Sequence, residues 1–490
     1  MTAQNSQHAF IGIDIGTSSV KALLASADGT VLDSFGAPHA MQRPNAGYAE
    51  QDPHVWMALV DQALAQFAAS MHASAVQAIG ITSQVNTHAF CDAQLQPLAN
   101  AITWQDTRAA RQASALDARL SEAQKIEALG APIPIDASHA LSRMAWMARH
   151  NPEIWSQTAH VFAPKDYAIA QLSGVACADP LASIGLVGTD FTYADAVLDL
   201  LPGAKAVLPT LNDPLAIAGR VAQGKPFEGV PIAQGTMDAW AAMFGLGVAQ
   251  EGQAMYLSGT SEVLGLVSQA RAGTPGIVVF PDWRGITLHA APTQAGGASL
   301  AWLSRLLGRS ISDLSELAAR ATITVDSPLF LPHLEGERAP LWDPASRGGF
   351  AGLTSASGPE ELAACVMEGV AFSARMGVEA LEESGKQPIT SLRHGGGGAN
   401  SDVWCQIRAN ALGRRLERVS VSEVGVAGAI AMASVASGHA EDMAQATRTL
   451  STIGAVFQPE PQAAMLADRR FAAYTKLYAA LRPVSDHLAS

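Results

Sequence analysis

Phe10-Ile11-Gly12-Ile13-Asp14-Ile15-Gly16-Thr17-Ser18-Ser19-Val20-Lys21 reads as a buried strand, a Gly-Thr-Ser turn and a second strand. The same order returns past the midpoint as Ala254-Met255-Tyr256-Leu257-Ser258-Gly259-Thr260-Ser261-Glu262-Val263-Leu264. A glycine after a buried strand lets the backbone turn tightly, and the neighbouring Thr and Ser supply N–H and hydroxyl donors that suit a phosphate. One such turn is also typical of an ordinary hairpin. Two copies, each at the start of one half of the chain, predict two similar domains that face one nucleotide.

Length and composition indicate a two-domain globular protein. The 490 residues are too many for one hydrophobic core, and we place two domains at residues 1–245 and 246–490. Hydrophobic residues make up 48% of the chain and charged residues 15%, which predicts extensive burial. The net charge is −13, with 31 Lys and Arg against 44 Asp and Glu, so we expect no nucleic-acid partner.

The cysteines and the apolar stretches indicate in which cellular compartment the protein is expected. The four cysteines are far apart and form no CxxC pair, so we interpret them as reduced core residues rather than as zinc ligands or disulfides. Residues 1–8 lack the basic and apolar regions of a signal peptide. No stretch approaches about 18 uninterrupted apolar residues, the length of a membrane span. We therefore expect a cytoplasmic protein with no membrane partner.

Local patterns predict the elements around these turns. Residues 8–15, 18–25 and 30–35 are expected to be three antiparallel strands, because Asp28-Gly29 is a hairpin signal. A helix over 55–69 and a strand over 76–82 follow, and residues 106–129 are expected to be mostly helical. Three strands before the first helix distinguish this pattern from a Rossmann unit, whose first strand leads directly into a helix.

Asp14 stands two residues before Gly16, at the end of the first strand. A carboxylate in that position can hold a hydrated Mg²⁺ beside the phosphates, since Mg²⁺ keeps several waters and takes one or two carboxylates. The alternative is an Asp that caps the turn through its own backbone. The Gly-Thr-Ser that follows favours the role in binding.

Asp238 follows an apolar segment and begins a helical pattern, so it could simply be an N-cap. Its position at the domain junction favours a second interpretation. A carboxylate in a cleft between domains can take the proton from a hydroxyl that attacks a phosphoryl group.

Two further segments carry polar or flexible groups. Gln84, Asn86 and His88, with Trp104, Asp106 and Arg108 downstream, could line a pocket for a polyhydroxylated ligand, or they could form a loop and a solvated helix start. Both interpretations stay open on these residues alone. The run from Gly395 to Gly398 permits close backbone approach to a ring or a phosphate, and the strand-like residues before it favour an ordered loop over a flexible one.

These motifs together resemble the FGGY family of carbohydrate kinases, along nearly the whole chain. The first turn resembles the family's first phosphate motif, and Gly259-Thr260-Ser261 resembles its second. Ala101-Ile102-Thr103-Trp104-Gln105-Asp106-Thr107-Arg108 is similar to a further family pattern, as is the stretch that contains Asp238. The most specific block is Gly336-Glu337-Arg338-Ala339-Pro340-Leu341-Trp342-Asp343 with the Gly-Gly-Phe-Ala-Gly-Leu run that follows.

The resemblance implies an α/β fold with two ribonuclease-H-like domains of the actin, hexokinase and Hsp70 type, and a cleft that holds ATP between them. Asp14 would position Mg²⁺ through water, and Asp238 would be the catalytic base. The expected nucleotide-binding residues are Gly16, Thr17, Ser18, Lys21, Gly259, Thr260, Gly396, Gly397, Gly398 and Asn400. Lys21 is the weakest of these, because it could face solvent. The expected substrate-binding residues are Gln84, Val85, Asn86, Trp104, Asp106 and Asp238.

Within the family the chain is most similar to the xylulokinase-like subgroup, which implies phosphorylation of a ketopentose such as D-xylulose and the formation of a homodimer. Another ketose, a polyol or an aldonate is the alternative substrate, and a catalytically silent sugar-binding relative is the alternative function. The subgroup usually carries Gln-Met-His-Gly where this chain has Gln84-Val85-Asn86-Thr87. We therefore expect Val85 and Asn86 to reshape the sugar pocket.

Overall fold

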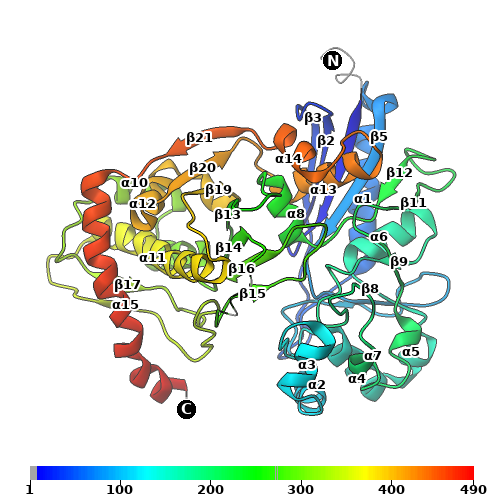
Figure 1. Cartoon of the computed structure of the whole chain (residues 1–490), viewed down its shortest axis with the longest axis horizontal. Coiled ribbons are helices and arrows are strands. Elements are labelled where there is room, and N and C mark those ends of the chain that lie inside the picture. Colours follow the sequence, from blue (N-terminus) through cyan, green and yellow to red (C-terminus); the bar gives the residue numbers. More distant parts are fainter. Residues whose placement is uncertain (1–7, 271, 273, 490) are drawn as a thin grey trace. The chain divides into compact units, whose positions relative to one another are not determined.

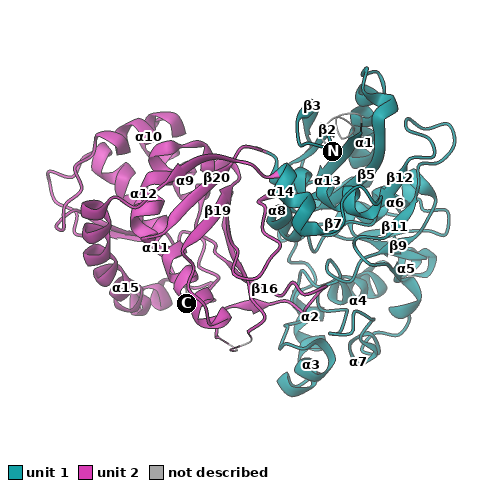
Figure 2. Ribbon diagram, turned by 45° about the horizontal axis from the view of Figure 1, so that its top comes forward, with its two compact units in different colours: residues 1–245, 423–450 teal, residues 246–422, 451–490 magenta. Residues whose placement is uncertain are grey.

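The computed structural model describes residues 8–270, 272 and 274–489, which form two compact units. Unit 1 comprises residues 1–245 and 423–450, and unit 2 comprises residues 246–422 and 451–490 (Figure 2). Each unit is an α/β structure built around its own mixed sheet (Figure 1). The α/β class expected from the sequence is confirmed.

The sheet of unit 1 has six strands. Their spatial order is β11 (Ile217–Arg220), β12 (Pro231–Ala233), β5 (Val76–Ser83), β1 (Ala9–Ile15), β2 (Ser19–Ser26) and β3 (Val31–Pro38). The first three strands along the chain are antiparallel, as expected, while β5 lies parallel to β1 and β12 lies parallel to β5. The outer strand β11 is antiparallel to β12. The three central parallel strands therefore end at the same edge of the sheet.

The two faces of this sheet carry different helices, because side chains alternate along a strand. Ile11, Ile13 and Ile15 on one face belong to the same core cluster as residues of α1 (Pro53–Ala68) and α6 (Pro164–Ser173). On the other face a Cβ added at Gly12 would lie 2.5 Å from the carbonyl oxygen of Val426 in α13 (Val424–Ala436). Glycine therefore allows α13 to contact the strand backbone directly, and α8 (Asp238–Gly245) packs against α13.

A second core of unit 1 is mostly helical. It contains buried residues of α4 (Ala140–His150) and contacts from α2 (Ala110–Asp117), α3 (Glu122–Leu129), α5 (Pro152–Gln157) and α7 (Asp195–Leu198). Residues 106–129, expected to be mostly helical, contain the two helices α2 and α3. The second begins afresh because Ser121 and Gln124 make a capping box. Short strands pair around this region: β4 (Glu50–Gln51) with β7 (Ala101–Ile102), β6 (Ala89–Cys91) with β8 (His160–Phe162), and β9 (Cys177–Ala178) with β10 (Thr210–Leu211).

The sheet of unit 2 repeats the topology of unit 1. Its order is β15 (Val278–Val279), β16 (Leu288–Pro292), β14 (Glu262–Val267), β13 (Ala254–Ser258), β19 (Ser391–Gly395), β20 (Arg415–Val419) and β21 (Ile453–Phe457). From β16 to β21 the strand directions match those from β3 to β11 in unit 1: two antiparallel pairs, two parallel pairs and one antiparallel pair. The duplication expected from the two Gly-Thr-Ser turns thus extends to the whole sheet.

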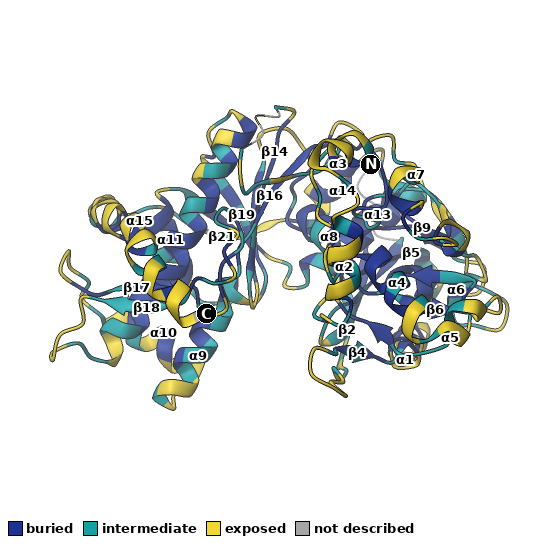
Figure 3. Ribbon diagram, turned by 90° about the horizontal axis from the view of Figure 1, so that it is seen from below, coloured by how far each residue is buried: buried dark blue, intermediate teal, exposed yellow. Residues whose placement is uncertain are grey.

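The helices of unit 2 surround this sheet and make two further cores. They are α9 (Gly297–Leu307), α10 (Ile311–Arg320), α11 (Pro359–Gly385), α12 (Asp402–Leu412) and α15 (Pro461–Ala489), and they pack with the pair β17 (Leu329–Leu331) and β18 (Gly349–Ala351). The central strands are buried, and the outer helices expose one side (Figure 3). The four cysteines are buried and free, as expected. No helix among the described residues has the length and apolarity needed to cross a bilayer.

One segment lies in a different unit from the one its sequence position suggested. The division at residues 245 and 246 assigned 423–450 to the second domain, but α13 and α14 (Met443–Leu450) belong to unit 1. The reason is the small size of the α13 residues. A Cβ at Gly80 of β5 would lie only 2.0 Å from the carbonyl oxygen of Ala429, and one at Gly428 only 1.7 Å from that of Ala241 in α8.

Candidate active site

Asp14 is the penultimate residue of β1, and its place in the strand puts it on the same face as Gly12 and α13. Its neighbour across the β1–β2 ladder is Lys21. The Nζ of Lys21 lies 2.7 Å from Oε2 of Glu423, at the start of α13. A carboxylate, an ammonium group and a second carboxylate therefore lie together at this edge of the sheet.

The surroundings of Asp14 disfavour its charged form. Burial raises its pKa to about 7, with further increases from the charges of Asp238 and Glu423 and a decrease from Lys21. Its Oδ1 is buried, and none of the described residues donates a hydrogen bond to it. Such an unsatisfied oxygen is costly unless a ligand or a water supplies the missing partner.

Asp238 is the first residue of α8 and adjoins the end of β5, since Met237 forms a parallel bridge with Ser83. Its Oδ1 accepts a hydrogen bond from the N–H of Ala239 at 2.8 Å, and burial raises its pKa to about 6. The structure therefore brings Asp14 and Asp238 close enough for their charges to interact, because Asp14 lies near the end of β1 and Asp238 adjoins the end of the neighbouring parallel strand β5.

In the first Gly-Thr-Ser turn some backbone groups are hydrogen-bonded to neighbouring residues and others have no partner within the described part of the chain. The N–H of Gly16 donates to the carbonyl of Ser19 at 3.0 Å, and Gln51 Nε2 donates to the carbonyl of Thr17 at 2.6 Å. None of the described residues accepts a hydrogen bond from the backbone N–H of Thr17 or Ser18, and Ser18 is exposed. Two free N–H donors in a fixed turn suit a phosphate oxygen.

The expected sugar-binding residues are linked to this turn. Trp104, which is 42% exposed, donates from its indole Nε1 to Oγ1 of Thr17 at 3.0 Å. Gln84 is buried, and its amide donates to Gln51 at 2.7 Å, so it supports the turn through that side chain. Val85 is partly buried beside it. The segment from Gln84 to Thr87 therefore lies next to the first phosphate turn.

Asn86 has a left-handed backbone conformation, with φ of 48°. Its amide donates to Ser138, and its carbonyl accepts a hydrogen bond from Arg143, which is fully buried. Arg143 also donates to Nδ1 of His88. This arrangement fixes the segment that departs from the xylulokinase-like pattern, and burial holds the pKa of His88 well below its ordinary value.

Asp106 has protein partners for both carboxylate oxygens. It is 1% exposed, Arg108 contacts it through Nε and Nη2, and the N–H of Ala49 donates to Oδ2 at 2.6 Å. Arg108 lies in turn over the ring of Tyr48, 3.7 Å from its centroid. The geometry thus gives Asp106 a structural role, and the substrate contact expected from the sequence stays a prediction that requires these bonds to open.

The second Gly-Thr-Ser turn, in unit 2, is exposed at Gly259 and Thr260. Their carbonyl groups accept hydrogen bonds at 2.9 Å from the first N–H groups of α9, those of Gly297 and Ala298. Leu257 stands where Asp14 stands in the first turn, because both precede the glycine by two residues. Only the first of the two turns therefore has a carboxylate two residues before its glycine.

The glycine run packs against the end of β13. A Cβ at Gly396, where φ is +89°, would lie 2.5 Å from the carbonyl oxygen of Ser258, and one at Gly398 would lie 2.2 Å from Oγ of Ser258. Gly397 and Asn400 are exposed. The loop is therefore ordered, as expected, and lies next to the second phosphate turn.

Sequence reasoning missed the side chain that ties these two segments together. Arg408 of α12 is fully buried and donates to the carbonyl of Gly398 at 2.8 Å, to Ser258 Oγ at 2.6 Å and to Glu262 Oε1 at 2.6 Å. A charged residue in a helical pattern ordinarily indicates a solvated face, so nothing in the local sequence distinguished it. Glu423, beside Lys21, was missed for the same reason.

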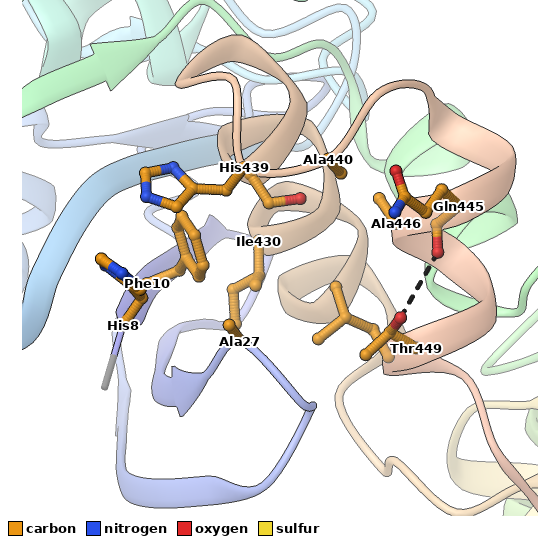
Figure 4. Close-up of a pocket in the computed structure, with 11 residues that line it drawn as sticks. His8, Phe10, Ala27, Ile430, His439, Ala440, Gln445, Ala446 and Thr449 are labelled. Carbon is orange, nitrogen blue, oxygen red and sulfur yellow. Dashed lines mark hydrogen bonds between the residues drawn. The ribbon is translucent and has the colours of Figure 1, made fainter. Parts of the chain in front are cut away.

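The cavity shown in Figure 4 lies elsewhere in unit 1. It holds about 60 Å³ and is lined by residues that include His8, Phe10, Ile430, His439 and Thr449. His8 and Phe10 are at the start of β1, while Asp14 is near its end. The cavity has no carboxylate in its lining and is separate from the candidate active site.

The donor set at Asp14 fits a hydrated magnesium ion. No group of three or more His, Cys, Asp or Glu side chains that could hold a metal was found among the residues that the structure describes. One carboxylate with an unsatisfied oxygen is a suitable partner for an ion that keeps most of its waters and takes its other ligands from phosphates.

Comparisons with known proteins agree with this geometry. Residues 9–245 match the N-terminal domain of the FGGY family of carbohydrate kinases, and residues 254–437 match its C-terminal domain. A xylulose kinase of Escherichia coli is 30% identical over 95% of this chain and 96% of its own. A glycerol kinase of Rhodopirellula baltica is 29% identical over 94% of this chain and 89% of its own. The crystal structure of a "xyloylose kinase" from Brucella ovis superposes with a TM-score of 0.86 at 27% identity, covering 97% of this chain and all of that one.

Proposed function

This chain belongs to the FGGY family of carbohydrate kinases, and from that premise we propose that it transfers a phosphoryl group from ATP to a hydroxyl of D-xylulose. A kinase of this family is a phosphotransferase with an alcohol group as acceptor. The observation that carries the proposal is a pair of carboxylates, Asp14 near the end of β1 and Asp238 beside the end of β5, next to a turn with free N–H donors.

Asp238 is the base in this proposal. Its Oδ2 accepts no hydrogen bond from any described residue, so it is free to take the proton of the acceptor hydroxyl. The hydroxyl oxygen then bonds to the γ-phosphorus while the bond from that phosphorus to the bridging oxygen of ADP breaks. The N–H groups of Thr17 and Ser18 would hold phosphate oxygens, and the proposed phosphate contacts of unit 2 are Gly259 and Thr260.

Asp14 would hold Mg²⁺ through water. The ion, when bound, neutralises charge on the phosphates, and Asp14 supplies one acceptor to its hydration shell. In unit 2 the proposed adenosine-side contacts are Gly396, Gly397, Gly398 and Asn400, supported by the close approach of this loop to Ser258. We also propose that the enzyme acts in the cytoplasm. We propose further that it forms a homodimer, and light scattering can check its mass in solution.

The relatives support two acceptor classes. The xylulose kinase of Escherichia coli favours a ketopentose, while the glycerol kinase relative makes a polyol the second candidate. A coupled assay of ADP release over D-xylulose, ribulose, erythritol, glycerol and gluconate separates them. The highest kcat/KM is expected with D-xylulose. A higher value with glycerol or erythritol would assign the polyol instead, and turnover with none of the five would contradict the proposal.

The departure at Val85 and Asn86 gives a sharper test of the pocket. The double variant Val85→Met and Asn86→His restores the residues usual in the xylulokinase-like subgroup. Histidine tolerates the left-handed conformation of position 86 better than most residues. We expect the ranking of acceptors to change while KM for ATP stays within about twofold. The new methionine and histidine side chains alter mainly the contacts around positions 85 and 86. An unchanged ranking would show that this segment does not line the pocket.

A further inference from the structure

Thr236 lies two residues before Asp238 and is fully buried. Its hydroxyl donates to Oδ1 of Asp179 at 2.8 Å. Its carbonyl accepts a hydrogen bond at 2.7 Å from the hydroxyl of Thr82, near the end of β5. The hydroxyl and the carbonyl of this residue are therefore fixed to elements other than the helix that Asp238 begins.

Asp179 belongs to a buried ionic cluster. Its Oδ2 lies 2.6 Å from Nζ of Lys165, and the same Nζ lies 2.5 Å from Oδ1 of Asp166. The side chain of Lys165 is fully buried, as is that of Asp179. Burying three charged side chains costs free energy, because they lose their hydration. Apolar side chains of similar volume in the same place often stabilise a protein as well or better. The cluster therefore calls for a reason other than stability.

The segment from β12 to α8 is fixed to this cluster and to the sheet at each residue. Gln234 donates from its amide to Asp166 at 3.0 Å, and its N–H donates to Ala216 at 2.9 Å. Gly235 has φ of +61° and donates to Pro214 at 3.0 Å. A Cβ at Gly235 would lie 2.2 Å from the carbonyl oxygen of Ile81, so the segment lies directly against β5.

We propose that Thr236 is a positioning residue for Asp238, held in place by the ion cluster of Lys165, Asp166 and Asp179. This inference rests on the proposed function, in which Asp238 takes the proton of the acceptor hydroxyl. A base works only within about 2.6–3.2 Å of the proton that it removes, and a displacement of about 1 Å can lower the rate 100-fold. The cluster contacts no reacting atom and acts only through the backbone that it fixes.

Thr236→Val tests this directly, because valine has the shape of threonine and lacks the hydroxyl. Oδ1 of Asp179 keeps the N–H groups of Leu181 and Ala182, both at 3.0 Å, so the carboxylate stays satisfied and the variant should fold. We expect kcat to fall by about 10- to 100-fold while KM for sugar and for ATP stay within about twofold. Thr236→Ser, which restores the hydroxyl, should recover most of the lost kcat.

Thr447→Val is the matched control. Thr447 is also buried in unit 1, but its hydroxyl bonds only to the carbonyl of Ala444 within α14. This variant should keep the wild-type kcat. A wild-type kcat for Thr236→Val, or an equal loss in Thr447→Val, would overturn the inference.

A second measurement keeps the inference separate from the proposed function. Amide hydrogen exchange in a peptide that covers residues 234–240 should be faster in Thr236→Val than in the wild type, and unchanged in Thr447→Val. If the wild type phosphorylates none of the sugars, the proposed function fails, and the exchange rates still report whether Thr236 fixes the segment. Wild-type exchange in Thr236→Val would then overturn the inference on its own.

Discussion

The charge of Asp238 raises the pKa of Asp14, although the two residues are far apart in the sequence. A nearby negative charge disfavours the charged form of a carboxylate, so Asp14 holds its proton more tightly while Asp238 is charged. A divalent cation bound beside Asp14 would favour the charged form of both. In the proposed mechanism, phosphoryl transfer and metal binding would therefore be linked through the protonation of these two side chains.

Asp238→Asn should lower kcat by at least about 1,000-fold, because an amide cannot accept the proton of the attacking hydroxyl. KM for ATP should change by less than about threefold, since Asp238 is not among the expected nucleotide contacts. Asp61→Asn, at an exposed position of α1, is the control and should retain full activity. Near-normal turnover in Asp238→Asn would rule out its assignment as the base.

The pH profile of kcat/KM should fall on the acid side with a midpoint near 6, the value to which burial raises the pKa of Asp238. At saturating Mg²⁺ the cation keeps Asp14 charged, so one ionisation is expected. At limiting Mg²⁺ the midpoint should move towards 7, because Asp14 then holds its proton longer. A profile independent of Mg²⁺ concentration would separate Asp14 from metal binding.

Asp14→Asn should stabilise the protein at alkaline pH while abolishing its activity. The pKa of Asp14 rises from 3.8 in the unfolded chain to about 7 in the fold, so its contribution to stability is present below pH 4 and is lost as the pH rises through 7. Asparagine carries no such penalty. The expected gain above pH 7 is about 1–3 kcal/mol, after a discount for the partial exposure of Asp14. Urea unfolding from pH 4 to pH 8.5 should show that the free energy of unfolding of the variant exceeds that of the wild type by an amount that grows with pH. An excess that is the same at every pH would contradict the raised pKa of Asp14.

Lys21→Met and Glu423→Gln should move the pKa of Asp14 in opposite directions. The charge of Lys21 lowers that pKa and the charge of Glu423 raises it, so removing Lys21 raises it and removing Glu423 lowers it. The acid limb measured at limiting Mg²⁺ reports the shift. Because the two side chains form an ion pair at 2.7 Å, the double variant should lie between the single ones.

Gly80→Ala should prevent the correct packing of unit 1. The added Cβ would lie 2.0 Å from the carbonyl oxygen of Ala429, and a backbone atom cannot move away without displacing α13. The expected loss is about 3 kcal/mol or more, and poor recovery of folded protein. Gly36→Ala is the control, because no atom lies within 4 Å of the added methyl group in β3, and its thermal midpoint should match the wild type.

The local pattern was sufficient for the elements that position the carboxylates. Alternating apolar residues, the Asp28-Gly29 signal and the Gly-Thr-Ser turn predicted β1, β2 and β3, and the place of Asp14 at the strand end followed from them. The strand that ends beside Thr82 was predicted in the same way. The approach of Asp14 to Asp238 was expected from the family resemblance and not from the local pattern, since β12, which precedes Asp238, and its parallel pairing with β5 were not predicted.

Contacts between distant small or charged residues could not be predicted. The helix α13 has glycine and alanine on every side, so its sequence carries no apolar stripe that indicates which sheet it covers. Its assignment to unit 1 depends on the missing side chains of Gly12 and Gly80. The burial of Lys165 and Arg408 could not be predicted either, because it depends on distant partners: Asp179 for Lys165, and Ser258 and Glu262 for Arg408.

The chain passes between the two units at residues 245–246, 422–423 and 450–451. Unit 1 is therefore incomplete until α13 has left the ribosome, which happens only when most of unit 2 has already been translated. During that interval no helix covers the face of β1 and β5 that contains Gly12 and Gly80. This face of the sheet would be exposed to chaperones or to other nascent chains. A fragment that stops at residue 245 would lack α13 and α14, so unit 1 cannot be completed before residues 246–422 of unit 2 have been translated.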